Sequence, residues 1–234
     1  MILAVLQARM GSSSLPGKSM ATLQGEPMIV RQLERLRGAR CLSKIIVATS
    51  QETADDALAG FLVSRGHTVH RGAGADILAR IARCAEAISA VSHVVRLKGD
   101  APFMDPGVVD DAIRMALASG ADYTSNRVHR TYPAGLEVEV IKASVLRQAA
   151  AEERDPAARV SPTAAIRNQP ERWRQAHLRA ARDCSRLDWR VKTAADLAFA
   201  RSVYDALYPG DPDFRMGDVL DLIENRQDIA RFAA

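Results

Sequence analysis

The sequence is poor in cysteine and aromatic residues, and it contains no long apolar run. Its three cysteines, Cys41, Cys84 and Cys184, are odd in number and widely spaced, which fits neither a disulfide framework nor a zinc site. Aromatic residues make up only 5% of the chain and no nucleic-acid-binding module is recognisable, so we expect no nucleic-acid partner. A membrane-spanning helix needs about 18 consecutive apolar residues, and no stretch offers them. The apolar run at residues 1–6 is short and lacks a basic start, so we expect a cytoplasmic protein without a signal peptide.

The composition is otherwise that of an ordinary globular protein. Hydrophobic residues make up 47% of the 234 residues and charged residues 26%, which is enough to bury a sizeable core. The formal net charge is +4, and the arginines are spread along the chain. This basic balance fits a site for a polyanion such as a triphosphate, and it fits general solvation equally well.

The first half of the chain alternates strand-like and helix-like segments. This alternation is typical of a parallel sheet covered by helices. The predicted strands are residues 2–7, 44–50, 67–71 and 93–98. The predicted helices are residues 28–37, 53–65, 76–89 and 105–118. Asp105 before Pro106 is a strong start signal for the last of these helices.

The second half is more mixed. Residues 136–140 alternate with period two, which predicts a strand with Glu137 and Glu139 on one face. Further strands are expected at 173–178 and 187–191, and helices at 194–207 and 216–224. No repeat or low-complexity linker divides the chain, so we expect a single domain over residues 1–234.

A basic loop rich in glycine and serine follows the first predicted strand, over residues 7–19. Loops at the carboxyl ends of strands bind ligands in open α/β sheets. Glycine and serine let backbone N–H groups approach phosphate oxygens, while Arg9 offers a bidentate fork and Lys18 a point charge. The loop therefore predicts a triphosphate site. The alternative is a flexible turn with two solvated cations.

Two familiar phosphate motifs do not fit. A P-loop has four residues between its first glycine and the Gly-Lys-Ser, whereas Gly11 and Gly17 are separated by five. Residues 72–77 lack the third small residue of a dinucleotide fingerprint. The loop is thus a different kind of phosphate site.

Residues 7–18 resemble the signature loop of the sugar-acid cytidylyltransferases, in the branch similar to spore-coat polysaccharide cytidylyltransferases. The resemblance continues through residues 47–50, 71–72, 77–80, 99–102, 105–106, 120–126, 132–140 and 187–197. It implies a three-layer αβα, glycosyltransferase-A-like fold with a mostly parallel sheet. It also implies transfer of CMP from CTP to a sugar acid or related acidic acceptor, with release of pyrophosphate, for polysaccharide or glycoconjugate biosynthesis. In relatives, an element that projects near the positions of His129 and Arg130 helps to build a homodimer, so the resemblance also implies a homodimer.

The loop and the resemblance together give a set of candidate site residues. The predicted nucleotide-binding residues are Ala8, Arg9, Gly11, Ser12, Ser13, Lys18, Ser50, Arg71 and Lys98. The predicted catalytic residues are Arg9, Lys18, Asp100 and Lys192.

Asp100 is the candidate metal ligand. It follows a buried-strand pattern after Gly99, and a carboxylate there suits a magnesium ion that bridges phosphates. The alternative is an aspartate that caps the next turn. Relatives usually carry a second aspartate where this chain has Lys192, so the metal site is altered. Either Lys192, with Lys98, partly replaces a cation beside the departing pyrophosphate, or activity has been lost.

The acceptor is expected at a segment of about residues 121–180 that also includes the dimerisation element. Asn126, Tyr132, Glu137 and Glu139 are the predicted acceptor-binding residues. The alternative for the two glutamates is a solvent-facing edge strand. Trp173 and Trp189 are expected in the core.

Two other functions remain open at this point. A glycosyltransferase on the same fold would use a nucleotide-sugar, but its usual Asp-x-Asp metal motif is absent. A non-catalytic nucleotide-binding paralogue is the third hypothesis.

Overall fold

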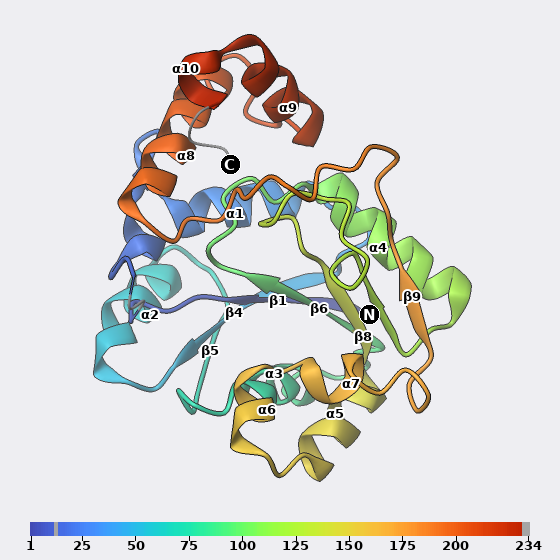
Figure 1. Cartoon of the computed structure of the whole chain (residues 1–234). Coiled ribbons are helices and arrows are strands. Elements are labelled where there is room, and N and C mark those ends of the chain that lie inside the picture. Colours follow the sequence, from blue (N-terminus) through green and yellow to red (C-terminus); the bar gives the residue numbers. More distant parts are fainter. Residues whose placement is uncertain (12–13, 231–234) are drawn as a thin grey trace.

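The computed structural model describes residues 1–11 and 14–230 and is built on a seven-stranded sheet (Figure 1). Its strand order is β5-β4-β1-β6-β8-β7-β9. β8 runs antiparallel to both of its neighbours, and the other adjacent strands are parallel. The strands are β1 Ile2–Gln7, β4 Lys44–Ser50, β5 Val69–Gly72, β6 His93–Lys98, β7 Tyr123–Ser125, β8 Glu139–Lys142 and β9 Gln175–His177.

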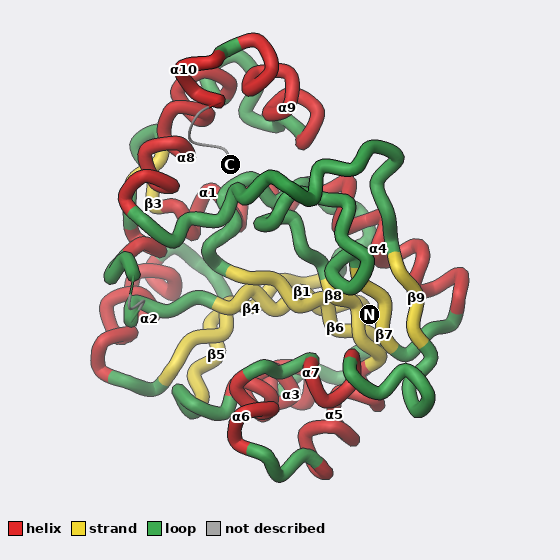
Figure 2. Tube along the Cα trace, in the orientation of Figure 1, coloured by secondary structure: helices red, strands yellow, loops and turns green. Residues whose placement is uncertain are grey.

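Helices cover both faces of this sheet, which gives three layers (Figures 1 and 2). One face packs against α1 Met28–Arg37, α2 Asp56–Ser64 and α4 Pro106–Ser119. The other packs against α3 Ile77–Glu86, α5 Ala143–Glu152 and α7 Ala164–Arg167, beside the short α6 Pro156–Val160. The predicted α/β class with a mostly parallel sheet is confirmed.

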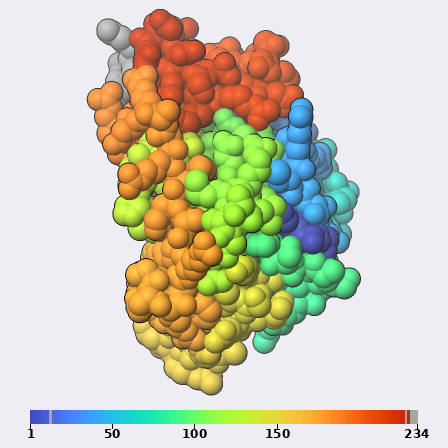
Figure 3. All heavy atoms as spheres, turned by 90° about the vertical axis from the view of Figure 1, so that its right-hand side faces the viewer, coloured from blue at the N-terminus to red at the C-terminus, as the bar shows by residue number. Residues whose placement is uncertain are grey.

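The C-terminal part adds a third core beyond one end of the strands. It contains α8 Ala194–Leu207, α9 Met216–Asn225 and α10 Gln227–Ala230. The hairpin of β2 Thr22–Leu23 and β3 Glu26–Pro27 packs there as well. Phe103 lies at its centre, 6.0 Å from the Trp189 ring and 5.7 Å from the Phe199 ring. Trp173 and Trp189 are both buried, as predicted. Figure 3 shows the segment that follows β9 (orange) running up one side to these helices.

Local signals placed the long elements well. The strands at 2–7, 44–50 and 93–98 and the helices at 28–37 and 194–207 have the predicted bounds. The Asp105 side chain caps α4 by accepting from Gly107 N, with Pro106 in the first turn. Thr193 and Asp196 form a capping box at α8.

Two predicted strands were wrong. Residues 187–191 form only an isolated bridge, between Asp188 and Ala134. The strand predicted at 136–140 begins only at Glu139, because the main chain before it pairs with a side chain: Asn126 donates to Leu136 O at 2.7 Å and accepts from Val138 N at 2.8 Å. Glu137 therefore lies just outside β8 and Glu139 inside it. No helix in the described part of the chain is both long and apolar enough to cross a membrane.

Candidate active site

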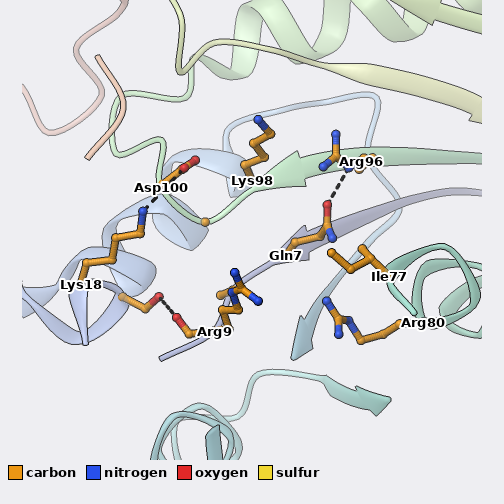
Figure 4. A pocket seen from close by; sticks show the side chains of 11 residues that line it. Gln7, Arg9, Lys18, Ile77, Arg80, Arg96, Lys98 and Asp100 are labelled. Atoms are coloured by element: carbon orange, nitrogen blue, oxygen red, sulfur yellow. Dashed lines mark hydrogen bonds and ion pairs between the residues drawn. The ribbon is translucent and has the colours of Figure 1, made fainter. Parts of the chain in front are cut away.

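A pocket of about 250 Å³ opens at the carboxyl ends of β1 and β6 (Figure 4). The two strands lie side by side, with Gln7 opposite Lys98. This is the edge at which open α/β sheets bind ligands, because loops there leave parallel strands in the same direction. The lining residues are Gln7, Ala8, Arg9, Lys18, Ser19, Ile77, Arg80, Arg96, Lys98, Gly99 and Asp100.

The loop after β1 brings Arg9 and Lys18 to this pocket. Arg9 is exposed at its edge, and its carbonyl accepts a hydrogen bond from Ser19 Oγ at 3.2 Å. Lys18 opens the 3-10 helix η1 Lys18–Met20, where its Nζ donates to Val191 O at 2.7 Å and lies 3.7 Å from Asp100 Oδ2. The predicted loop cations therefore meet the predicted carboxylate in one pocket.

Of the remaining predicted loop residues that the structure describes, only Ala8, which is buried, lines the pocket. Gly11 is exposed, and a Cβ added to it would meet nothing within 4 Å. Ser12 and Ser13 lie outside the described residues.

The pocket is strongly cationic. Arg9, Lys18, Arg80, Arg96 and Lys98 all line it, against the single carboxylate of Asp100. Such an excess of positive charge in a concave site favours a ligand with several negative charges. A nucleoside triphosphate meets that requirement.

Arg80 is a lining residue that the sequence did not assign. It lies on α3 and is buried; its Nη1 donates to Ala73 O at 2.7 Å, and its Nε has no partner within the described ranges. A buried donor without an acceptor is uncommon, so a ligand oxygen is a fitting partner. One indication of a role for Arg80 was present in the sequence, its place in residues 77–80, which resemble the family. The amphipathic pattern of the helix does not distinguish a buried arginine from one on the surface.

Asp100 follows Gly99, a position where any residue with a side chain would force the backbone to move. A Cβ at Gly99 would lie 2.6 Å from Gln7 O, so a side chain there would push β1 and the loop apart. Asp100 O accepts from Val191 N at 2.8 Å, while Asp100 Oδ1 is buried without a partner in residues 1–11 and 14–230.

This carboxylate is a suitable ligand for a divalent metal ion that is also held by phosphate groups. Magnesium is usually held by one or two carboxylates together with substrate phosphates and water. Asp100 supplies one carboxylate with an unused oxygen. Nowhere in the described chain do three or more His, Cys, Asp or Glu residues gather as a metal site. Among the residues that line the pocket, Asp100 is the one carboxylate that could hold such an ion.

Lys192 lies outside the lining of this pocket. Its Nζ is exposed and donates to Asp188 Oδ2 at 2.8 Å. Arg190 contacts the same carboxylate through Nε and Nη2, at 2.9 and 2.5 Å. Partial burial acts to raise the pKa of Asp188, but these hydrogen bonds hold it well below its usual range. The role of Lys192 at the phosphates stays a prediction.

Ser50 and Arg71 also lie beyond the pocket lining, at the ends of β4 and β5. Ser50 is buried, and its Oγ donates to Asp55 Oδ2 at 2.5 Å. Asp55 Oδ1 in turn accepts from Met10 N at 2.6 Å, which fixes the start of the loop. Arg71 donates to Ser50 O at 2.9 Å and to Asp56 at 2.6 Å. Both residues support the loop, and direct nucleotide contact stays a prediction.

The predicted acceptor residues divide into buried and accessible ones. Asn126 is buried, with its amide on the main chain of residues 136 and 138. Tyr132 is partly buried and packs against the first and third cores. Glu137 is partly exposed, and its Oε2 accepts from Gly135 N at 2.8 Å.

Glu139 is 1% exposed, so it is not on a solvent-facing edge, and β8 lies inside the sheet. It forms an ion pair with Arg96 and accepts from Tyr123 Oη and Thr163 Oγ1, each at 2.6 Å. Burial acts to raise its pKa, but the Arg96 guanidinium and the two hydroxyls lower it to about 2. Arg96 also donates from Nε to Gln7 Oε1 at 2.6 Å. Glu139 thus holds the floor of the pocket from behind and offers no free oxygen to an acceptor.

The fold places a cationic pocket at the carboxyl edge of a mostly parallel sheet, where it suits a nucleoside polyphosphate. A family model described as cytidylyltransferase matches residues 3–187. The chain belongs to the cytidylyltransferase family and is therefore a nucleotidyltransferase.

Two curated relatives illustrate the family. Spore coat polysaccharide biosynthesis protein SpsF of Bacillus subtilis is 30% identical over 98% of this chain and 96% of its own length. The 3-deoxy-manno-octulosonate cytidylyltransferase of Geobacter sulfurreducens is 35% identical over 48% of this chain, which spans 44% of that protein.

Solved structures agree on the fold. A cytidylyltransferase from Leptospira borgpetersenii superposes with a TM-score of 0.91 at 24% identity, over 97% of this chain and 95% of that one. A CMP:2-keto-3-deoxy-manno-octonic acid synthetase complexed with CTP gives 0.66 at 18% identity, over 87% and 98%. Rv0371c from Mycobacterium tuberculosis, complexed with manganese, gives 0.60 at 15% identity, over 88% and 99%.

Proposed function

We propose that this enzyme transfers CMP from CTP to a sugar acid and releases pyrophosphate, for the synthesis of a polysaccharide or glycoconjugate. The observation that carries the proposal is the cationic pocket at the ends of β1 and β6, in a chain of the cytidylyltransferase family. The relatives add the substrate class: one is named for 3-deoxy-manno-octulosonate, and SpsF for spore coat polysaccharide.

The loop after β1 binds the triphosphate. Arg9 and Lys18 contact its oxygens, and Arg80 donates from its unpaired Nε. Lys18 must release Val191 O or share its donors between that carbonyl and a phosphate oxygen. Ala8 and the backbone beyond β1 frame the base.

The transfer is an in-line displacement at the α-phosphorus. The acceptor hydroxyl gives up its proton to water as its oxygen forms the new bond to the α-phosphorus. The bond from the α-phosphorus to the α–β bridging oxygen breaks, so pyrophosphate leaves with that oxygen. The protein contributes position and charge, because Arg9, Lys18 and Arg80 stabilise the negative charge that gathers on the leaving group. Asp100 would hold a magnesium ion, which supplies further positive charge to the phosphates when bound.

A screen of pyrophosphate release tests this proposal. The four nucleoside triphosphates are assayed against a panel of sugar acids and phosphonates, with Arg9→Ala, Lys18→Ala and the double variant. We expect release only with CTP, and a loss of about a hundredfold in kcat/KM for each single variant, as for loss of a charge-stabilising group. Lys44→Ala is the matched control, because Lys44 is exposed at the start of β4, the opposite end of the sheet.

Other results would identify the alternatives. Release of a nucleoside diphosphate from a nucleotide-sugar would indicate a glycosyltransferase. Binding of CTP without pyrophosphate release from any acceptor would indicate a non-catalytic paralogue. Unchanged CTP binding in the double variant would place the nucleotide outside this pocket.

We further propose a magnesium-dependent, cytoplasmic homodimer. The carboxylate of Asp100 supports magnesium, which prefers oxygen ligands. Asp100→Asn tests this, because loss of the carboxylate should abolish the metal-dependent tightening of CTP binding measured by calorimetry. Dimerisation through the segment of about residues 121–180 rests on family resemblance, and sedimentation of the purified chain measures it. Turnover that is equal in excess chelator would instead support lysines as the charge partners of the phosphates.

A further inference from the structure

Two positions on the same face of β6, Arg96 and Lys98, each carry a cation opposite a glutamate. β6 and β8 are antiparallel, with Arg96 opposite Glu139. If this register is continued by two residues, Lys98 falls opposite Glu137, just where the hydrogen-bonded pairing has ended. Residues 96 and 98 point to the same face of the sheet, because side chains alternate along a strand. The inner of these two cation–glutamate positions is buried, and the outer one lies at the carboxyl edge, where the pocket opens.

The outer position is not closed by an ion pair. Lys98 lines the pocket, and no carboxylate in residues 1–11 or 14–230 comes within ion-pair distance of its Nζ. Glu137 accepts from Gly135 N instead. Burial lowers the pKa of the Lys98 ammonium, while Asp100 and Glu137 act to raise it. A partly buried ammonium without a partner is unfavourable, and an anionic ligand would remove that penalty.

The surroundings of Lys98 assign it to the acceptor side of the pocket. Lys98 is the last residue of β6, and the register continued from Arg96 and Glu139 sets it opposite Glu137. Glu137 belongs to the predicted acceptor segment. In Figure 4, Lys98 extends from the end of β6 with Asp100 on one side and Arg96 on the other, apart from Arg9.

We propose that Lys98 binds the carboxylate of the acceptor and Glu137 its hydroxyl groups, so that this pair selects a polyhydroxy acid over a neutral sugar. The inference rests on the proposed function and deepens it, because it moves Lys98 from the nucleotide to the acceptor. Arg127, whose side chain is 30% exposed, lies near the inner position, with its Nη1 3.7 Å from Glu139 Oε1. An ammonium suits a single carboxylate, and a carboxylate such as Glu137 accepts hydrogen bonds from adjacent hydroxyls.

The test measures acceptor selectivity and nucleotide binding separately. The protein, Lys98→Met, Lys98→Arg and the control Lys44→Met are assayed for pyrophosphate release from CTP with a panel of sugar acids that includes 3-deoxy-manno-octulosonate, and with the carboxamide of each. For Lys98→Met we expect the KM for the acid to rise about tenfold to a hundredfold, the typical effect of a lost charge-assisted hydrogen bond. Its preference for acid over carboxamide should disappear, and Lys98→Arg should retain it. The Kd for CTP from calorimetry should stay within about twofold.

Three outcomes would overturn the inference. An unchanged acid preference in Lys98→Met shows that Lys98 does not contact the carboxylate. A weaker Kd for CTP with an unchanged acceptor KM places Lys98 at the phosphates. If the unchanged protein releases no pyrophosphate with any acid, the proposed function itself fails, and the inference fails with it.

Discussion

The inner and outer cation–glutamate positions of β6 use similar residue types and reach opposite states. Arg96 and Glu139 are both buried and paired, and Tyr123 and Thr163 donate to the same carboxylate. Lys98 and Glu137 are partly exposed and unpaired with each other. A single residue, Leu97, separates the two positions along the strand. The difference coincides with the end of the β6–β8 pairing. Thr163 and Arg167, in and beside α7, contact the inner glutamate, whereas Lys98 at the outer position lines the pocket.

This comparison suggests a division of labour between stability and recognition. A buried pair with additional hydrogen bonds fixes one arrangement of its neighbours, here Gln7 on the pocket floor. An unpaired lysine at the rim keeps its charge available to a ligand. If the comparison is correct, changes at the inner position should affect folding, and changes at the outer position should affect acceptor recognition.

The largest expected effect follows from removal of the inner carboxylate. Glu139→Gln leaves Arg96 buried without a counter-charge, and loss of one partner of a buried pair destabilises proteins by about 3–5 kcal/mol. Chemical denaturation of the purified variant measures this change. Glu137→Gln is the matched control and should lose less than about 1 kcal/mol, because Glu137 is in no ion pair within the described residues. Equal losses in both variants would contradict the distinction.

Acid titration tests the same carboxylate without a mutation. The pKa of Glu139 falls from 4.5 to about 2 on folding, so its contribution is complete above about pH 4.5 and is lost as the pH falls towards 2. A shift of this size corresponds to about 3 kcal/mol of stability. The free energy of unfolding, measured between pH 5 and 2 in the protein and in Glu139→Gln, should fall more steeply in the protein. Parallel curves would show that folding does not lower the pKa of Glu139.

The register behind this comparison could not be read from the sequence. The period-two pattern of residues 136–140 predicted a strand there, but only residues 139 and 140 lie in β8. It did not show that β8 inserts between β6 and β7, because strand pairing depends on residues far apart in the chain. β7 was missed altogether, since three residues carry too little periodicity.

The convergence of Arg9, Lys18 and Asp100 on one pocket could be predicted from the sequence, whereas the arrangement of the predicted acceptor residues could not. Arg9, Lys18 and Asp100 follow strands whose apolar runs are clear, and carboxyl ends of parallel strands meet at one edge. Arg80 was not predicted, because its burial depends on how α3 packs against the sheet. Asn126 was given to the acceptor, whereas it completes the main-chain hydrogen bonds of a segment that has no strand beside it. The burial of Arg80 and the hydrogen bonds of Asn126 both depend on contacts between segments far apart in the chain.

The outer position should respond in recognition. Glu137→Gln keeps an oxygen for Gly135 N but weakens acceptance from sugar hydroxyls, so we expect the acceptor KM to rise about tenfold while the Kd for CTP is unchanged. Steady-state kinetics with the sugar acid and calorimetry with CTP measure the two quantities. Glu152→Gln, an exposed glutamate at the end of α5, is the control for loss of a surface charge. A rise in KM that is equal in the control would remove Glu137 from the acceptor site.

The smallest effect is expected at a third pair, which is exposed. Lys192→Met removes the ammonium that contacts Asp188, and a surface ion pair contributes less than about 1 kcal/mol, so the free energy of unfolding should hardly change. Because Asp188 also holds Arg190, the local structure keeps one of its two cations. As long as Lys192 stays on Asp188 during turnover, kcat/KM for CTP should remain within about threefold, whereas loss of a cation that stabilises the leaving pyrophosphate would cost a hundredfold or so. Such a loss in the variant would show that Lys192 leaves Asp188 when CTP binds, and that this exposed lysine adds its charge to that of Arg9 and Lys18 at the phosphates.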